Sequence, residues 1–185
     1  MSIVDKEREK RDYDLAVQET RDAAENGDVS AMTALGYIYA TGQGVDIDEQ
    51  EALRWYRMAA EYGDVLAQNN LGMIYLCGQG VDIDEPEAVR WFRKAADQSY
   101  APAAVNLGLM YYNGQGVAMD ETEAATWFRK AASHGDVIAA HNLGLMYESG
   151  EGVDMDEAEA MRWFRKAAEQ SYAPARRSME TMYVV

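Results

Sequence analysis

The sequence has few of the residues that metal sites, disulfide frameworks and catalytic sites require. Its 185 residues include one cysteine, two histidines and three prolines. Cys77 alone allows no disulfide within the chain. His134 and His141 are seven residues apart, which is not the i, i+4 spacing of a helical metal-binding pair. We therefore expect no metal, no cofactor and no enzymatic activity.

Positive charge is also scarce. The chain has 17 Lys and Arg against 32 Asp and Glu, which gives a net charge of −15. Nucleic acids and anionic membrane surfaces both attract basic proteins, so the sequence argues against either as a partner. No apolar run approaches the length of a transmembrane helix.

The first ten residues, MSIVDKEREK, are charged and lack the apolar core of a secretory signal. Together with the single cysteine, they predict a cytoplasmic location. A signal already cleaved from the chain would leave the same pattern.

A constant period organises most of the chain. Three kinds of residue recur at intervals of 36, as subtraction of their numbers shows: Trp55, Trp91, Trp127 and Trp163; Gly36, Gly72, Gly108 and Gly144; Tyr39, Tyr75, Tyr111 and Tyr147. A fixed period of this size is typical of a solenoid of stacked repeats, which is a binding scaffold.

Each repeat divides into two helices joined by a turn. In residues 64–99 the apolar positions follow i, i+4, i+7, i+8 in the first half and i, i+3, i+4, i+7, i+8 in the second. Each pattern places the apolar residues on one face of a helix. In the turn between them, Gly78 can take the left-handed conformation that ends a helix, and Asp84 can cap the next helix.

The period predicts four full repeats and two terminal segments. The repeats occupy residues 27–62, 63–98, 99–134 and 135–170. Residues 1–26 resemble the second helix of a degenerate repeat, because Glu19 stands where the repeats have Trp. Residues 171–185 resemble a first helix, and both segments are expected to cap the stack.

The last helix has an apolar edge that predicts either self-association or truncation of a longer array. Glu180 replaces the glycine of the repeat, and Met179 replaces its leucine. The edge consists of Met179, Met182, Tyr183, Val184 and Val185.

The turns are acidic, and we interpret them as structural. Each has an Asp with a Glu three residues later, as in Asp48 and Glu51, which resembles a capping box. Acidic residues also suit the first turn of a helix because of the helix dipole. The turns lack the ligand register of a calcium loop, and Ile47 and Ile83 stand where a dinucleotide fingerprint needs a third glycine.

These residues resemble the Sel-one-like repeat, a relative of the tetratricopeptide repeat. The motifs that carry the resemblance are Leu-Gly-x-x-Tyr, Gly-x-Gly-Val, an Asp, Trp-Phe/Tyr and a closing Ala-Ala, in four copies from about Gly27 to Gln170. The resemblance implies an all-α, right-handed superhelical α/α solenoid that acts as an adaptor or scaffold. One branch of the family is secreted and joined by paired cysteines, and the single Cys77 departs from it.

In tetratricopeptide relatives the first helices line a concave face. The first helices of the four repeats carry no Lys or Arg, so this face is expected to be uncharged and mixed, and unsuited to a terminal carboxylate. We predict that it binds a protein or peptide segment. In this prediction the Asn side chains hydrogen-bond to the backbone amides of the segment, and Met, Leu and Tyr contact its side chains. The predicted site comprises Asn69, Asn70, Met73, Leu76, Asn106, Leu109, Tyr112, His141, Asn142 and Leu145.

Several alternatives stay open at this point. The Asn side chains could tie one repeat to the next. The chain could self-assemble through its C-terminal helix, bind a small ligand or glycan, or hide a catalytic set in one groove. We assign the Trp and Phe/Tyr pairs to the core, and Met110 and Met146 with them. The four copies are so alike that none stands out as the site.

Overall fold

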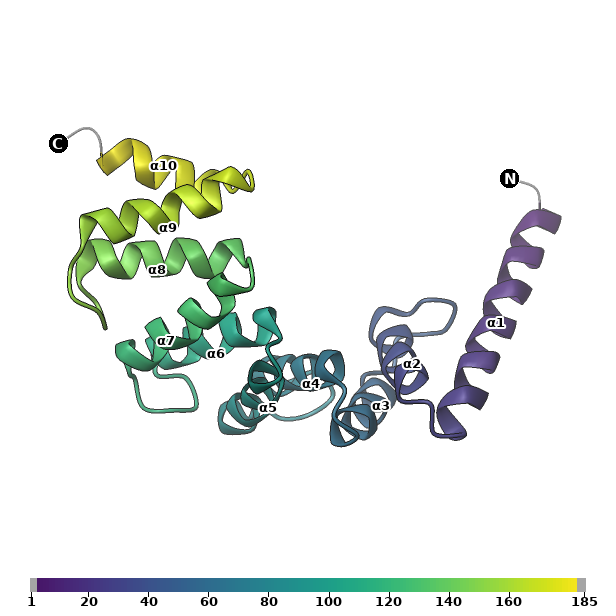
Figure 1. Cartoon of the computed structure of the whole chain (residues 1–185). Helices are drawn as coiled ribbons and strands as arrows, with labels where there is room; N and C mark the ends of the chain where they lie inside the picture. Colours follow the sequence, from purple (N-terminus) through teal and green to yellow (C-terminus); the bar gives the residue numbers. More distant parts are fainter. Residues whose placement is uncertain (1–2, 183–185) are drawn as a thin grey trace. The chain divides into compact units, whose positions relative to one another are not determined.

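The computed structural model describes residues 3–182, which form ten α-helices and contain no strand (Figure 1). The helices are α1 (Ile3–Glu25), α2 (Val29–Thr41), α3 (Glu49–Glu61), α4 (Val65–Cys77), α5 (Glu85–Asp97), α6 (Ala101–Asn113), α7 (Glu121–Ser133), α8 (Val137–Ser149), α9 (Glu157–Glu169) and α10 (Ala173–Met182). The prediction of an all-α solenoid built from helix-turn-helix repeats is confirmed.

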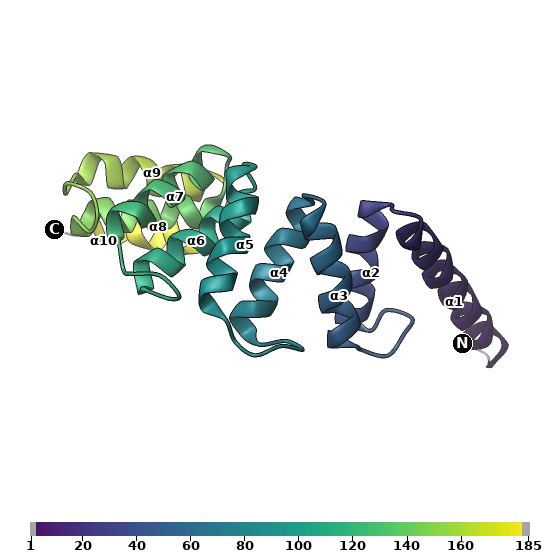
Figure 2. The same cartoon turned by 90° about the horizontal axis from the view of Figure 1, so that it is seen from below.

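The chain forms two compact units, residues 1–91 and 92–185, and the division falls within α5. In the N-terminal unit, α1 packs against α2, α2 against α3, and α3 against α4. In the C-terminal unit the same order runs from α6 to α10 (Figure 2). Each helix thus packs mainly against its neighbours in sequence, as in a repeat array.

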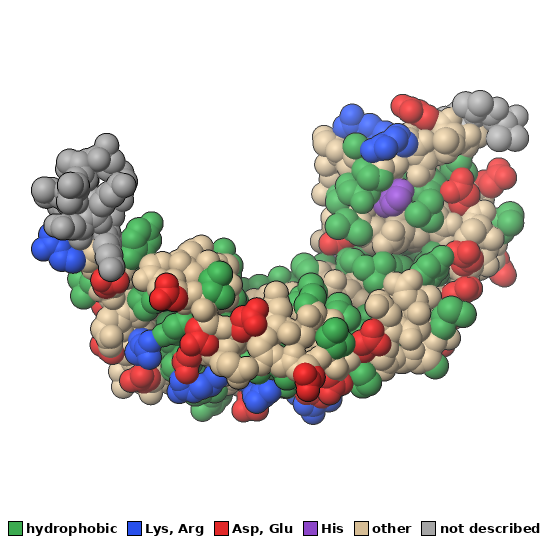
Figure 3. Space-filling model, turned by 180° about the vertical axis from the view of Figure 1, so that it is seen from behind, with side chains coloured by type: hydrophobic (Ala, Val, Ile, Leu, Met, Phe, Trp, Pro, Cys, Tyr) green, Lys and Arg blue, Asp and Glu red, His purple; other side chains and the backbone are tan. Residues whose placement is uncertain are grey.

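Basic side chains are separated from the first helices of the repeats. Helices α2, α4, α6 and α8 contain no Lys or Arg, whereas the second helices carry ten of them. In the N-terminal unit, Lys and Arg side chains gather along the lower edge of the view in Figure 3. The charge separation expected from the sequence is therefore present in the helices.

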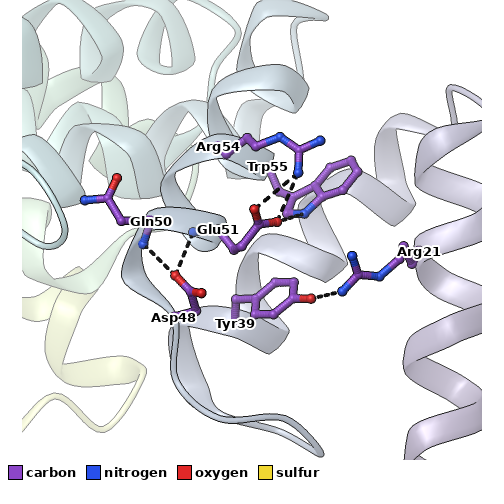
Figure 4. Close-up of polar contacts among 7 residues, drawn as sticks. All are labelled: Arg21, Tyr39, Asp48, Gln50, Glu51, Arg54 and Trp55. Atoms are coloured by element: carbon purple, nitrogen blue, oxygen red, sulfur yellow. Dashed lines mark hydrogen bonds and ion pairs between the residues drawn. The ribbon is translucent and has the colours of Figure 1, made fainter.

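The helix ends match the prediction. Asp48 caps α3, because its Oδ1 accepts from the backbone N–H groups of Gln50 and Glu51 at 3.1 and 3.0 Å (Figure 4). Four first helices end in the left-handed conformation, at Gly42, Gly78, Gly114 and Gly150, with φ from 67° to 78°. These caps satisfy backbone groups that a helix end leaves unpaired.

The second half of the predicted capping box is wrong. The Glu51 carboxylate accepts from the indole N–H of Trp55 at 3.0 Å and lies 3.0 Å from Arg54 (Figure 4). The N–H of Asp48 donates instead to the carbonyl of Tyr39 at 3.0 Å. Since the turn already supplies that acceptor, the glutamate is available to the tryptophan.

The Glu–Trp hydrogen bond recurs only in part. Glu87 accepts from the indole of Trp91 at 2.7 Å. The buried indole N–H groups of Trp127 and Trp163 have no acceptor within the described part of the chain. The bond is therefore a feature of the two copies in the N-terminal unit.

The glycine of each first helix permits close contact with an aromatic ring of its second helix. A Cβ atom on Gly36 would lie 2.8 Å from the ring of Tyr56. On Gly144 it would lie 2.5 Å from the ring of Phe164. The glycine therefore allows the two helices of a repeat to approach closely. The core assignment of the aromatic pairs and of Met110 and Met146 is confirmed, because all of them are buried.

The second glycine of two turns packs against the preceding repeat. A Cβ atom on Gly80 would lie 2.9 Å from the carbonyl oxygen of Glu49 at the start of α3. On Gly152 it would lie 2.2 Å from the carbonyl oxygen of Glu121 at the start of α7. These contacts hold the two turns against the repeat before them, a role that was not predicted from the sequence.

Arg–Tyr hydrogen bonds link α1, α3, α5 and α7 each to the next helix in the chain. The Arg57 guanidinium donates to the hydroxyl of Tyr75 at 2.7 Å, and Arg129 donates to Tyr147 at 3.0 Å. Arg21 forms the same bond with Tyr39 (Figure 4), and Arg93 forms it with Tyr111. The partners are always 18 residues apart, so the recurrence was visible in the sequence, although its meaning was not.

Alanine at position 144 tests the contact between glycine and ring. We expect Gly144→Ala to lower the free energy of unfolding by about 1–3 kcal/mol, because the added methyl overpacks against Phe164. Urea unfolding followed by circular dichroism measures the change. A second substitution, Phe164→Leu, should recover part of the loss. If the double variant loses as much unfolding free energy as the two single variants together, the overpacking explanation is contradicted.

Glycine at position 99 tests the left-handed helix ends. Ser99 and Ser171 have φ of 66°, at the position where Gly27, Gly63 and Gly135 stand in other copies. We expect Ser99→Gly to raise the free energy of unfolding by about 1 kcal/mol, since a Cβ is strained there. The reciprocal change, Gly63→Ser, has no atoms to clash with and should lower it by a similar amount. Urea unfolding of both variants measures these changes. If the free energy of unfolding changes in the same direction in both, the strain at the left-handed position is contradicted.

Candidate functional site

In each first helix of the four repeats, the residue directly after the glycine is an apolar side chain exposed to solvent. These residues, Tyr37, Met73, Leu109 and Leu145, are between 36% and 50% exposed. The leucine before each glycine is fully buried. A single exposed apolar residue is ordinary, so the row gains meaning only where it borders a cavity.

Such a cavity lies between α6 and α8. Its volume is about 130 Å³, and most of its wall is apolar. It is lined by Leu109, Tyr112, Phe128, Asn142, Leu145, Met146 and Glu151. Four of these, Leu109, Tyr112, Asn142 and Leu145, belong to the predicted site. We call this cavity the α6–α8 pocket.

A carboxylate lies at the polar side of the α6–α8 pocket. The hydroxyl of Tyr112 donates to Glu151 Oε2 at 2.7 Å, which joins one repeat to the turn of the next. This hydrogen bond raises the pKa of Tyr112, and burial and the negative charges of Glu151 and Glu121 raise it further. The pocket is thus apolar with a carboxylate, Glu151, on its wall.

The equivalent place in the N-terminal unit is smaller. A cavity of about 30 Å³ lies between α2 and α4, lined by Ala40, Glu49, Ala52, Ile74 and Gln79. By the 36-residue period, Ala40 corresponds to Tyr112 two repeats later, and Gln79 to Glu151. The copies are thus not equivalent, although the sequence analysis singled out none of them.

The asparagines at equivalent positions of three repeats, Asn70, Asn106 and Asn142, have more than one role. The side chain of Asn70 hydrogen-bonds with the hydroxyl of Tyr56, across the contact of α4 with α3. Burial, with a smaller contribution from Tyr37, raises the pKa of Tyr56 to about 12, and the Asn70 hydrogen bond opposes that rise. This contact favours, at Asn70, the alternative that these side chains tie neighbouring repeats. The later copies have phenylalanine in place of Tyr56, and there Asn106 is half-buried and Asn142 lines the α6–α8 pocket.

His141 packs between repeats. Its ring centroid lies 5.5 Å from those of Phe164 and Tyr172, and its Nε2 is 3.2 Å from Ser178 Oγ of α10. Burial lowers the pKa of His141. Hydrophobic side chains gather beside a histidine on the C-terminal unit in Figure 3. The half-buried His141 thus belongs to the contact of α8 with α9 and α10.

The remaining predicted residues lie on α4. Met73 is exposed, and Asn69 and Leu76 are half-buried. At the C-terminus, Met179 and Met182 are half-buried, while Tyr183, Val184 and Val185 of the predicted apolar edge lie outside the described residues. Self-association through that edge stays a prediction.

Within residues 3–182, no group of three or more His, Cys, Asp and Glu side chains could hold a metal ion. No helix in that range has the length and apolar character needed to cross a membrane.

Comparison with known proteins follows the repeat period. A family model, the Sel1 repeat, matches residues 29–64, 65–100, 101–136 and 137–172. Among solved structures, a protective antigen of uropathogenic Escherichia coli that displays an SLR fold is 38% identical, with a TM-score of 0.89. A Sel1 repeat protein from Oxalobacter formigenes is 32% identical, with a TM-score of 0.83.

The chain is shorter than these two proteins. The alignments cover 90% and 92% of this chain, but 36% of the Escherichia coli protein and 49% of the Oxalobacter protein. Cysteine rich protein B of Helicobacter pylori is 25% identical, with a TM-score of 0.57, over 70% of this chain and 93% of that one. A search of curated proteins found no match.

The pKa of His141 predicts a pH dependence of stability. Because burial lowers that pKa below 6.5 in the folded state, the unfolded chain binds the proton more readily. Stability from the neutral imidazole is thus present above pH 6.5 and is lost as the pH falls. We test this with His141→Asn, which introduces the residue found at the equivalent position 69. Between about pH 7.5 and about pH 5.5, the melting temperature of this variant should fall less than that of the wild type. Equal losses in differential scanning fluorimetry would contradict this assignment.

Proposed function

Because the chain belongs to the Sel1 repeat family, whose members generally act as non-catalytic scaffolds in protein–protein interaction, we propose that it binds a segment of a partner protein at the α6–α8 pocket. The observation that carries this proposal is the presence of Leu109 and Leu145 on the wall of an apolar cavity that opens beside two hydrogen-bonding side chains.

The cavity suits one apolar side chain of a partner. A volume of about 130 Å³ accommodates an aliphatic side chain, and Phe128 and Met146 supply buried walls. Full burial of such a side chain stabilises a complex by about 1.5–3 kcal/mol. Asn142, on the same wall, offers an amide that can both donate to and accept from a peptide backbone. A segment would therefore be held by one anchor and by backbone hydrogen bonds.

The N-terminal unit has no equivalent anchor in this proposal. The cavity between α2 and α4 is too small for a side chain of the size that the α6–α8 pocket admits. On α4, Met73 is exposed and Asn69 and Leu76 are half-buried, so any contacts that this helix makes with a partner are expected to be surface contacts.

A pair of matched double variants tests the proposal. The variant Leu109→Gln, Leu145→Gln removes apolar wall without adding charge. Its control, Met119→Gln, Met155→Gln, changes two apolar turn residues of the same unit that are 66% and 67% exposed. We expect affinity capture from the native lysate to retain a partner with the wild type and the control. The pocket variant should retain at least tenfold less, because losing the anchor costs more than about 1.4 kcal/mol.

Two results would contradict the proposal. A partner retained equally by all three proteins would move the binding surface away from the α6–α8 pocket. A partner lost by the control as well would assign the interaction to the apolar turns. Circular dichroism and melting temperature of each variant confirm that it is folded before capture.

A further inference from the structure

The carboxylates beside the α6–α8 pocket form no ion pair within the protein. Glu151 lines the pocket and accepts from the Tyr112 hydroxyl, and the backbone of Glu121 lies against Gly152, the residue after Glu151. Within the part of the chain that the structure describes, no Lys or Arg forms an ion pair with either of them. Helices α6 and α8, which flank the pocket, contain no Lys or Arg.

The backbone holds the two carboxylates in place. Gly152 packs directly on the carbonyl of Glu121, which fixes the turn that carries Glu151 against the start of α7. The Tyr112 hydroxyl further orients Glu151 through the hydrogen bond of 2.7 Å. Both glutamates are half-buried. A charge in such a position has lost part of its hydration, so an added cation gains more there than at a fully exposed carboxylate.

We propose that the α6–α8 pocket recognises a protein segment in which an aliphatic side chain is accompanied, within a few residues, by a lysine or arginine. The aliphatic group enters the cavity lined by Leu109 and Leu145, and the cation meets Glu121 and Glu151. This inference rests on the proposed function and names the chemistry of the segment that the same pocket binds.

The charges and the size of the pocket disfavour other occupants. An acidic or phosphorylated segment would meet two carboxylates, which repel it. A sugar would need aromatic platforms, and of the two aromatic residues that line the cavity Phe128 is buried and Tyr112 is half-buried. The cavity between α2 and α4 has Glu49 but a neutral Gln79 in place of the second carboxylate, so the same preference is expected to be weaker there.

A phage-displayed library of random decapeptides tests the inference with the full-length chain. We expect the wild type to enrich peptides that carry Leu, Ile or Met with a Lys or Arg within about three residues. The variant Glu121→Gln, Glu151→Gln should keep the aliphatic preference and lose the basic one. Residue 151 becomes the glutamine found at positions 43, 79 and 115, so this turn is compatible with the fold.

A charge-matched variant controls for the overall acidity of the protein. Glu25→Gln, Glu61→Gln removes two exposed carboxylates from helix ends of the N-terminal unit, where negative charge is unfavourable. A synthetic peptide chosen from the enriched set should bind this control and the wild type equally. It should bind the pocket variant about three- to tenfold more weakly, as expected for loss of charge-assisted contacts.

The outcomes separate the two proposals. Enrichment of aliphatic peptides without basic residues would overturn the charge preference and leave the proposed function standing. A basic preference that survives unchanged in the pocket variant would also overturn it, because the preference would come from net charge. Peptides that bind Leu109→Gln, Leu145→Gln as well as the wild type, or a selection that enriches no peptide, would overturn both.

Discussion

Contact between a helical glycine and an aromatic ring is the constraint on which the repeat depends. At Gly36, Gly108 and Gly144 the ring of the second helix occupies the space that a side chain would need. The two helices of a repeat therefore approach with their backbones close together. The leucine before the glycine is buried by this approach, and the residue after it turns toward solvent. The exposed apolar row that includes Leu109 and Leu145 is thus a consequence of how the core packs.

Connections between repeats decide where that row borders a cavity. Gly80 and Gly152 lie on the start of the preceding second helix, and an Arg–Tyr bond spans each step from one repeat to the next. Between α6 and α8 this arrangement brings Tyr112 to Glu151 across 39 residues of sequence. The pocket forms where a large side chain and a carboxylate replace the alanine and glutamine of the smaller cavity.

Much of the fold could be predicted because it repeats, whereas the site could not. Period and apolar pattern predicted the helices, and Asp and Gly predicted their ends, since these depend on neighbours within a few residues. The capping box failed at Glu51 because a sequence does not tell whether a carboxylate meets a backbone N–H or an indole. The contact between Asn70 and Tyr56 could have been noticed in the sequence, because Tyr56 has a hydroxyl where the later copies have phenylalanine. The α6–α8 pocket depends on residues far apart in sequence, Tyr112 and Glu151, that differ from the residues at the same positions of other repeats. A pattern shared by all repeats does not reveal such a pair.

The first helices lack cations because the basic side chains stand on the second helices, where they make other contacts. Arg57 and Arg129 bond to tyrosines of the next repeat, and Arg54 lies over Trp55 and pairs with Glu51. Lys166 donates to the carbonyl of Ala132. The Glu151 carboxylate at the α6–α8 pocket is bonded to a neutral hydroxyl instead of a cation. Its negative charge is therefore available to a basic group of a partner.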